Sequence, residues 1–193
     1  MAPKTKRKST DTLTGYQRRL VRELEETASL LKLDYQDIKS YERAARTPLL
    51  EMMRRKLIIS EVITSYTLTD EHLKVCLCHY FFGRKKSFIR LWKTKRFKLF
   101  NHHVLEELPL MAKLRFAKSI SKVPKAVAAD IERLNALRNG LAHAFFPENL
   151  KRSKPEWKGK KIFTIDGLRT FLEDMSKLDG YFLHLLPEEL EIF

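Results

Sequence analysis

Residues 124–143 read PKAVAADIERLNALRNGLAH and supply the clearest structural pattern in the chain. Apolar residues recur there every three or four positions, which is the spacing of one face of an α-helix. Pro124 suits the start of such a helix, because a residue in the first turn has no intrahelical partner for its N–H. We therefore expect a long helix after Pro124, with an apolar face made by Val127, Ala128, Ile131, Leu134, Leu137 and Leu141.

The sequence before this helix shows similar spacing. It predicts helices over residues 13–33 and 48–66, followed by a further helix over residues 70–82. Thr69 or Asp70 is a plausible N-cap for this further helix, because side-chain oxygens of these residues accept hydrogen bonds from backbone N–H groups in the first turn. Gly83 then follows as a helix-ending glycine.

The later part of the chain is also predicted to be mostly helical. Residues 100–121 have helical spacing, with Pro109 at a helix start. Residues 162–165 read as a short extended segment, and Asp166 is expected to cap a final helix over residues 168–186. A polar basic loop is expected before the extended segment, over residues 151–159. The predicted fold class is therefore all-α, an antiparallel helical bundle with one short extended segment before the last helix.

Length and composition favour one helical domain over residues 11–193 after a basic, disordered tail over residues 1–10. The chain has 193 residues, of which 44% are hydrophobic. Cys76 and Cys78 are too close in sequence for a disulfide framework, and a reducing cytosol is the default expectation. We find no run of roughly eighteen apolar residues that would span a bilayer. A soluble, cytoplasmic protein with no membrane partner is expected.

The net charge of +14 makes a polyanion the first expected partner. The charge is segregated, since residues 84–125 contain thirteen Lys and Arg against two Glu, and residues 151–161 contain six against one. This density exceeds what a mixed-sign soluble surface needs, which favours nucleic acid. The residues expected to bind RNA are Arg84, Lys85, Lys86, Arg90, Lys93, Lys95, Arg96, Lys151 and Arg152.

Aromatic residues alternate with cations in the first basic stretch, and two interpretations stay open. Phe88, Trp92, Phe97 and Phe100 are the aromatic positions. Cations with aromatics are typical of a surface that neutralises phosphates and stacks on unpaired bases. The other interpretation leaves the cations as a solvated face and turns Phe88, Leu91, Trp92 and Leu99 toward the core.

Arg138, Asn139 and His143 form the most informative polar group in the sequence. On an ideal helix, positions 138 and 143 are about 140° apart around the axis, too far for both side chains to act on one atom. Gly140 permits a left-handed conformation that would bend the helix and swing His143 back toward Arg138. Glu61, on an earlier predicted helix, is a candidate to orient the Arg138 guanidinium.

An arginine and a histidine placed together support phosphodiester chemistry. A histidine with a pKa of ~6.5 can take a proton from a ribose 2′-hydroxyl or give one to a leaving 5′-oxygen. An arginine can hold the scissile phosphate through two hydrogen bonds. Together they would cleave RNA without a metal and leave a cyclic phosphate. The structural alternative is that Arg138 caps helix carbonyls and His143 is a half-buried ring.

The string Arg138-Asn139-x-x-x-His143 on a helix resembles the HEPN superfamily, with its R-x4-6-H ribonuclease motif. Residues 159–168, followed by Phe171, resemble the extended lead-in and closing helix of HEPN-like bacterial proteins. The resemblance covers about residues 45–185, and motif-level similarity is confined to residues 134–175.

The resemblance implies a metal-independent endoribonuclease of the toxin–antitoxin or phage-defence kind, with no cofactor. Arg138 and His143 would be catalytic and Asn139 supporting, in a homodimer whose two motifs form one cleft. An antitoxin or another defence protein is a possible partner. Phe145 stands where one branch has a tyrosine modified by nucleotidyl transfer, so the resemblance does not extend to that regulation. The alternative is a non-catalytic helical module of a defence complex that binds nucleic acid or protein.

His72, Cys76 and His79 share one face of a predicted helix, and these residue types bind zinc. A structural zinc site normally needs four ligands, and a fourth is not evident. Cys76 and Cys78 also fit a buried helical stripe, where cysteine behaves as a small apolar residue. No metal site is predicted.

Overall fold

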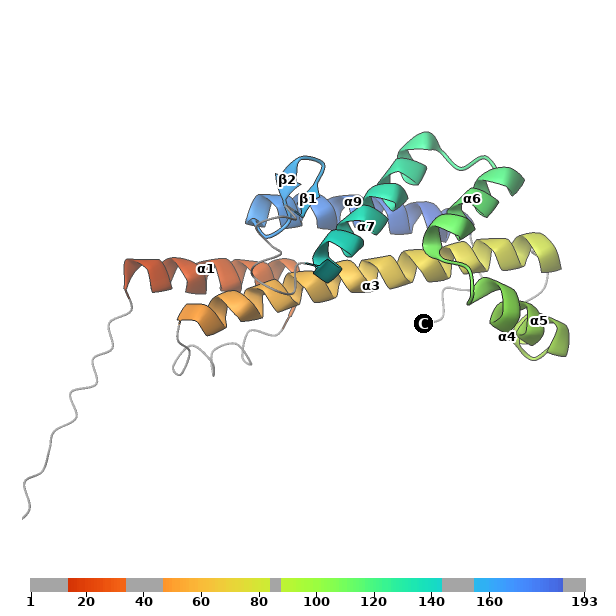
Figure 1. Ribbon diagram of the computed structural model, residues 1–193, viewed down its shortest axis with the longest axis horizontal. Helices are drawn as coiled ribbons and strands as arrows, with labels where there is room; N and C mark the ends of the chain where they lie inside the picture. The colour runs from red at the N-terminus through yellow and green to blue at the C-terminus, as the bar shows by residue number, and fades with distance from the viewer. Residues whose placement is uncertain (1–13, 34–46, 84–87, 144–154, 186–193) are drawn as a thin grey trace, which may run out of the picture. The chain divides into compact units, whose positions relative to one another are not determined.

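The computed structural model describes residues 14–33, 47–83, 88–143 and 155–185. These residues are mostly helical, which confirms the all-α class, and one short hairpin interrupts the helices (Figure 1). The elements in chain order are α1 (Gly15–Leu30), α3 (Thr47–Phe82), α4 (Phe88–Trp92), α5 (Lys95–Phe100), the π-helical turn η1 (Asn101–Leu105), α6 (Leu110–Ile120), α7 (Lys125–His143), β1 (Glu156–Trp157), β2 (Lys160–Lys161) and α9 (Ile165–Leu185).

The chain divides into two compact units, Met1–Leu57 and Ile58–Phe193. Helix α3 contributes its first turns to the first unit and the remainder to the second. The single helical domain over residues 11–193 stays a prediction. Within the described ranges, no helix is both long enough and apolar enough to cross a lipid bilayer.

In the first unit, α1 packs against the first turns of α3. Arg54 is buried there, with its Nε donating to the Thr27 hydroxyl at 3.1 Å and its Nη1 paired with the Glu23 carboxylate at 3.0 Å. Burial lowers the pKa of Arg54, and the charge of Glu23 acts in the opposite direction. The apolar residues of this contact are Leu24, Ala28 and Leu50, with Val21 and Leu57 beside them.

In the second unit, α6, α7 and α9 each contact the remainder of α3 (Figure 1). The helix starts predicted at Pro109 and Pro124 are confirmed, because α6 and α7 begin at the next residue in each case. The predicted apolar face of α7 is confirmed too, except that Val127 is only partly buried. The core residues of these helices include Ile58, Val62, Leu73 and Leu77 of α3, Leu110 and Leu114 of α6, Ile131, Leu134, Leu137 and Leu141 of α7, and Leu168, Phe171 and Leu178 of α9.

The helix break predicted at Thr69 and Asp70 is wrong, because α3 continues through both residues. The Thr69 hydroxyl donates to the Ser65 carbonyl, one turn earlier in the same helix, at 2.8 Å. The Thr69 hydroxyl therefore forms its hydrogen bond within α3 instead of capping a new helix. The predicted end is confirmed, since Gly83 has a positive φ of 84° and its N–H reaches the His79 carbonyl at 3.0 Å.

The extended segment predicted at residues 162–165 is wrong, since the strands lie earlier in the chain. Strands β1 and β2 pair antiparallel across a turn made by Lys158 and Gly159, which have φ values of 47° and 81°. Two consecutive residues with positive φ fit the twist of a tight hairpin. The predicted basic loop is therefore wrong at residues 156–157, which form β1, while Lys158 and Gly159 are a turn and residues 151–154 lie outside the described residues.

The cap predicted for the last helix is displaced by two residues. Helix α9 begins at Ile165, and the Thr164 hydroxyl accepts a hydrogen bond from the Gly167 N–H at 3.1 Å. Asp166 therefore lies in the first turn instead of capping it. A Cβ added at Gly167 would lie 2.1 Å from the Lys161 carbonyl oxygen, so a residue without a side chain lets α9 approach β2 closely.

Candidate functional site

Helix α7 runs without interruption from Lys125 to His143. Gly140 is helical and does not have a positive φ, so the predicted bend at this glycine is wrong. Positions 138 and 143 consequently lie about 140° apart around the helix axis. Position 143 falls instead on the face shared by Ala136 and Gly140. The His143 side chain lies outside the described residues.

Arg138 is exposed and lies against α3. Its guanidinium carbon is 5.4 Å from the centroid of the Tyr66 ring, and its Nη1 donates to the Asn139 side-chain oxygen at 3.2 Å. Asn139 therefore supports Arg138 directly. Burial raises the pKa of Tyr66, and the Arg138 charge acts in the opposite direction. Among the described residues, no carboxylate forms an ion pair with Arg138, so its charge is not neutralised.

Glu61 does not orient Arg138 as expected. It is half-buried, and its pKa is raised, first by burial and then by the neighbouring negative charge of Asp179 on α9. Tyr66 takes the supporting position instead. Sequence reasoning missed Tyr66 because an aromatic at a helical core spacing does not reveal which later helix will lie across it.

A groove of about 290 Å³ lies beside Gly140. A Cβ added at this glycine would meet no atom within 4 Å. The face of α7 that carries position 143 therefore has open space next to it. The groove is lined by Arg133, Ala136, Leu137 and Gly140 of α7 and by Pro155, Glu156 and Lys158.

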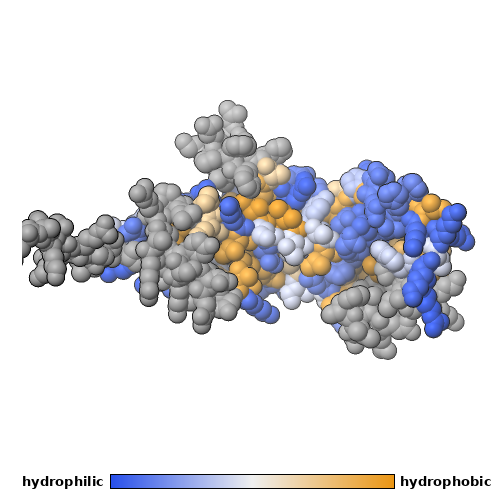
Figure 2. Space-filling model, turned by 90° about the horizontal axis from the view of Figure 1, so that it is seen from below, coloured by the Kyte–Doolittle hydropathy of each residue, from blue (hydrophilic) through white to orange (hydrophobic). Residues whose placement is uncertain are grey.

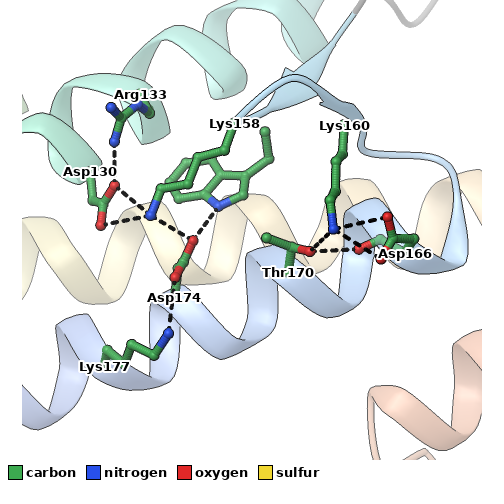
Figure 3. Close-up of polar contacts among 9 residues, drawn as sticks. Asp130, Arg133, Lys158, Lys160, Asp166, Thr170, Asp174 and Lys177 are labelled. Atoms are coloured by element: carbon green, nitrogen blue, oxygen red, sulfur yellow. Dashed lines mark hydrogen bonds and ion pairs between the residues drawn. The ribbon is translucent and has the colours of Figure 1, made fainter.

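Three cations near the hairpin, Arg133, Lys158 and Lys160, pair with carboxylates (Figure 3). The Lys158 amine lies 2.7 Å from Asp174 and 3.1 Å from Asp130, and Arg133 pairs with Asp130 at 2.6 Å. Asp174 also accepts a hydrogen bond from the indole N–H of Trp157 at 2.9 Å. Burial acts to raise the pKa of Asp174, but the hydrogen bonds from Lys158 and Trp157 outweigh it and hold that pKa low.

The same carboxylates determine the pKa of Lys158. Burial acts to lower that pKa, but hydrogen bonds from the Lys158 amine to Asp174 and Asp130 raise it above its ordinary value. Lys160, the next lysine of the hairpin, pairs with Asp166 at 2.9 Å and also donates to Thr170. The described lysines with these partners therefore hold the hairpin against α7 and α9.

The α4–α5 segment differs, because its cations are exposed and unmatched. Among the described residues, no carboxylate forms an ion pair with the predicted RNA-binding residues here. Figure 2 shows a mostly hydrophilic surface at this end of α3. Arg84, Lys85, Lys86, Lys151 and Arg152 lie outside the described residues. The four described members of the predicted set are Arg90, Lys93, Lys95 and Arg96.

Other cations of the 84–125 stretch have structural partners. Lys113 is 2% exposed, and its amine contacts both carboxylate oxygens of Asp70 at 2.6 and 2.7 Å. Lys118 pairs with Glu132 at 2.8 Å. The sequence total for this stretch therefore overstates the charge available to a ligand.

The core interpretation of the aromatic residues is correct in part, and base stacking stays a prediction. Leu91 is buried, as the core interpretation requires, and Phe97, which that interpretation did not include, is buried too. The Phe88 side chain lies outside the described residues. Trp92 and Leu99 are exposed, with 51% and 48% of their surface accessible, so the inward placement is wrong for both. Phe100 is partly buried.

The residues considered for zinc binding make other contacts. The His72 ring stacks on Phe182 with centroids 5.1 Å apart, and its Nδ1 lies 3.8 Å from Asp179. Burial raises the pKa of the Cys78 thiol to about 12. Within the part of the chain that the structure describes, no group of three or more His, Cys, Asp or Glu side chains is arranged to hold a metal ion.

Comparisons with protein-family models, with curated proteins and with solved structures find no match for this chain.

Proposed function

We propose that the protein is a metal-independent endoribonuclease with a HEPN-type helical bundle, in which Arg138 binds the scissile phosphate and His143 transfers protons. The observation that carries this proposal is the state of Arg138. Its guanidinium is exposed, is held by Tyr66 and Asn139, and has no carboxylate partner among the described residues. An arginine held in this way keeps its charge for an incoming phosphate.

The chemistry follows from the donors that remain on Arg138. A guanidinium has five N–H groups, and the contact with Asn139 occupies only one side of Nη1. The others can hold two phosphate oxygens and offset the charge that develops on them. A neutral histidine takes the proton of the ribose 2′-hydroxyl, and the 2′-oxygen then attacks phosphorus. The P–O5′ bond breaks as the protonated histidine gives that proton to the leaving 5′-oxygen, and the product is a 2′,3′-cyclic phosphate.

The helical geometry favours a site composed of two copies. One α7 places positions 138 and 143 on different faces of the helix, about 140° apart around its axis. A dimer in which Arg138 of one copy faces His143 of the other would bring both side chains to one phosphate. This arrangement agrees with the homodimer that the family resemblance implies.

The test is cleavage of an end-labelled RNA in excess chelator. We expect fragments that end in a cyclic phosphate, and a loss of at least 100-fold in rate for Arg138→Ala and for His143→Ala. Arg133→Ala is the matched control, since Arg133 is an exposed arginine of the same helix that pairs with Asp130. A mixture of the two inactive variants should regain part of the activity through mixed dimers.

Two outcomes would overturn the proposal: intact RNA after incubation with the wild-type protein, or cleavage that Arg138→Ala retains. Salt-sensitive RNA binding without cleavage would favour the alternative, a non-catalytic helical module that binds nucleic acid. The exposed cations of α4–α5 support that second candidate, because binding needs no catalytic residue.

A role in toxin–antitoxin or phage-defence systems is the biological part of the proposal and rests on the family resemblance. Expression of the wild-type protein in a bacterial host should slow growth, and expression of His143→Ala should not. Equal growth of both strains, at equal protein levels, would contradict this role.

A further inference from the structure

Trp92 is an exposed aromatic with firm support beneath it. It is the last residue of α4, with 51% of its surface accessible, and its ring lies 5.4 Å from the ring of Phe97. Phe97 is 1% exposed and contacts Phe82, which in turn contacts Phe100. Trp92 therefore rests on a packed aromatic cluster, with about half of the residue's surface accessible.

The short segment that carries this ring also carries exposed cations. Within the described ranges, no carboxylate pairs with them, and Arg96 is held over the Phe82 ring at 5.8 Å. Glu106 is an acidic residue that follows this segment, and it is engaged by Asn101 and His102. We call this surface the α4–α5 platform, consisting of Trp92, Leu99, Arg90, Lys93, Lys95, Arg96 and Lys98.

We propose that the α4–α5 platform binds single-stranded RNA, with Trp92 stacking on an unpaired base and the cations contacting flanking phosphates. An exposed aromatic ring can stack on a base only where the base is not already stacked in a duplex. The exposed cations supply the electrostatic part of the affinity. The proposal deepens the proposed function by naming its substrate class, and the choice of RNA over DNA rests on that function.

A lipid surface fits the platform less well. A helix that lies in a membrane interface needs an extended apolar face opposite its charges. Helices α4 and α5 have only five and six residues, and their described large exposed apolar side chains are Trp92 and Leu99. The chemistry therefore favours a strand that offers one base to one ring.

The platform is distant from the candidate catalytic arginine. Phe82, which contacts Arg96, and Tyr66, which contacts Arg138, are separated by about 24 Å along α3. Substitutions at Trp92 should therefore leave the surroundings of Arg138 unchanged. Binding at the platform can be measured separately from cleavage.

The test uses the natural tryptophan fluorescence of the chain. The two tryptophans are Trp92 and Trp157, and Trp157 is 0% exposed, so a ligand that quenches emission acts on Trp92. The His143→Ala variant is titrated with oligo(U). The wild-type protein is titrated with oligo(dT), which lacks the attacking 2′-hydroxyl. Both single strands should quench the emission, and a duplex of equal length should quench it much less.

Trp92→Ala should weaken binding of both single strands about tenfold. Trp157 is the only tryptophan left in this variant, and its emission from a buried site reports whether the fold is intact. Trp92→Phe keeps an aromatic ring on Phe97 and should bind with intermediate affinity. The matched control is Tyr16→Ala, which removes an exposed aromatic that lies beside Arg19 on α1, and it should bind as the wild type does.

Three results would overturn the platform: wild-type affinity in a folded Trp92→Ala variant, equal quenching by duplex and single strand, or quenching by phosphatidylserine vesicles but not by oligonucleotides. The proposed function fails separately. If oligo(U) and oligo(dT) bind through Trp92 but RNA is never cleaved, the platform stands and the nuclease proposal does not. If RNA is cleaved and Trp92→Ala cleaves it with unchanged KM, only the platform is wrong.

Discussion

The α4–α5 platform and the β1–β2 hairpin are both rich in lysine and arginine, yet their cations have opposite surroundings. Around the hairpin, Lys158 and Lys160 contact carboxylates of α7 and α9. On the platform, Lys95 and Arg96 have no carboxylate partner among the described residues. The same residue types therefore stabilise the fold in one place and stay available to a ligand in the other.

The difference has a physical cause in the needs of each element. A two-stranded hairpin is marginally stable by itself, so its side chains must bind to the helices it lies on. The platform helices are held instead by buried aromatics such as Phe97. Arg96 lies over the Phe82 ring at 5.8 Å, and among the described residues no carboxylate pairs with the platform cations, so they stay available to the polyanion proposed above.

The largest expected effect comes from removing the carboxylate at the centre of the hairpin network. Asp174→Ala leaves the buried Trp157 N–H without its acceptor and removes the nearest carboxylate to Lys158. We expect the free energy of unfolding to fall by about 3 kcal/mol. Urea denaturation measures this loss. Lys177→Ala is the control, because Lys177 is exposed and lies 3.4 Å from the same carboxylate, and it should cost less than about 0.5 kcal/mol.

If Asp174→Ala left the free energy of unfolding unchanged, the pair between Asp174 and Lys158 would not stabilise the hairpin. The contrast between the paired hairpin lysines and the exposed platform cations would then fail. The dependence of the free energy of unfolding on pH, at acidic pH, gives a second check. Because hydrogen bonds hold the pKa of Asp174 below its ordinary value of 3.8, its stabilising contribution is present above that value. That contribution should be lost as the pH falls below it, in the wild type but not in the variant.

The next effect separates the two regions by nucleic-acid binding. The double substitution Lys95→Ala, Arg96→Ala should weaken single-strand binding about tenfold at low salt and lower the salt slope by about 1.4. Lys160→Ala removes a lysine that is paired with Asp166, and we expect it to change neither quantity. Fluorescence titrations at several salt concentrations measure both. Equal losses for the two variants would show that internal pairing does not decide which cations bind.

Glu61 and Asp179 form a third kind of site, in which carboxylates are half-buried beside each other. Burial and then Asp179 raise the pKa of Glu61, so the folded protein holds the Glu61 proton more tightly than the unfolded chain does. Its charged form is therefore a cost at pH 7 that disappears as the pH falls below the ordinary value of 4.5.

Glu61→Gln should accordingly raise the free energy of unfolding at pH 7, by up to about 1 kcal/mol after allowance for solvent screening. The gain should shrink to nothing near pH 4. Denaturation at several pH values measures it. Glu71→Gln is the control on the same helix, because Glu71 is exposed and pairs with Lys74. A gain for Glu61→Gln that is constant with pH would mean that the effect is not electrostatic.

Local sequence patterns predicted the helices well because those patterns are local. Apolar spacing located α1, α6 and α7, while Pro109, Pro124 and Gly83 marked helix ends. The helix break predicted at Thr69 is wrong because tertiary packing decides the outcome there. Thr69 has the chemistry of a cap, but the buried face of α3 continues on both sides of it, and packing outweighs one capping bond.

The sequence could not show which lysines and arginines pair with carboxylates in the folded protein. Lys158 and Asp130 are 28 positions apart, and only the folded hairpin brings them together. The turn that makes this possible needs a positive φ at Lys158, a conformation for which lysine gives no sequence signal. Arg138 was identified from its motif, whereas its support by Tyr66 depends on how α7 crosses α3.

The smallest expected effect tests the backbone at the motif itself. Gly140 is an interior helical residue, has no positive φ, and has open space where a Cβ would be. Gly140→Ala should therefore raise the free energy of unfolding by about 0.5–1 kcal/mol, because alanine loses less conformational entropy in a helix. Thermal denaturation measures the gain. Gly167→Ala is the opposite control, since its Cβ would collide with the Lys161 carbonyl and must destabilise. A loss of stability in Gly140→Ala would instead indicate a left-handed glycine, and would restore the bent helix end that brings His143 toward Arg138 within one chain.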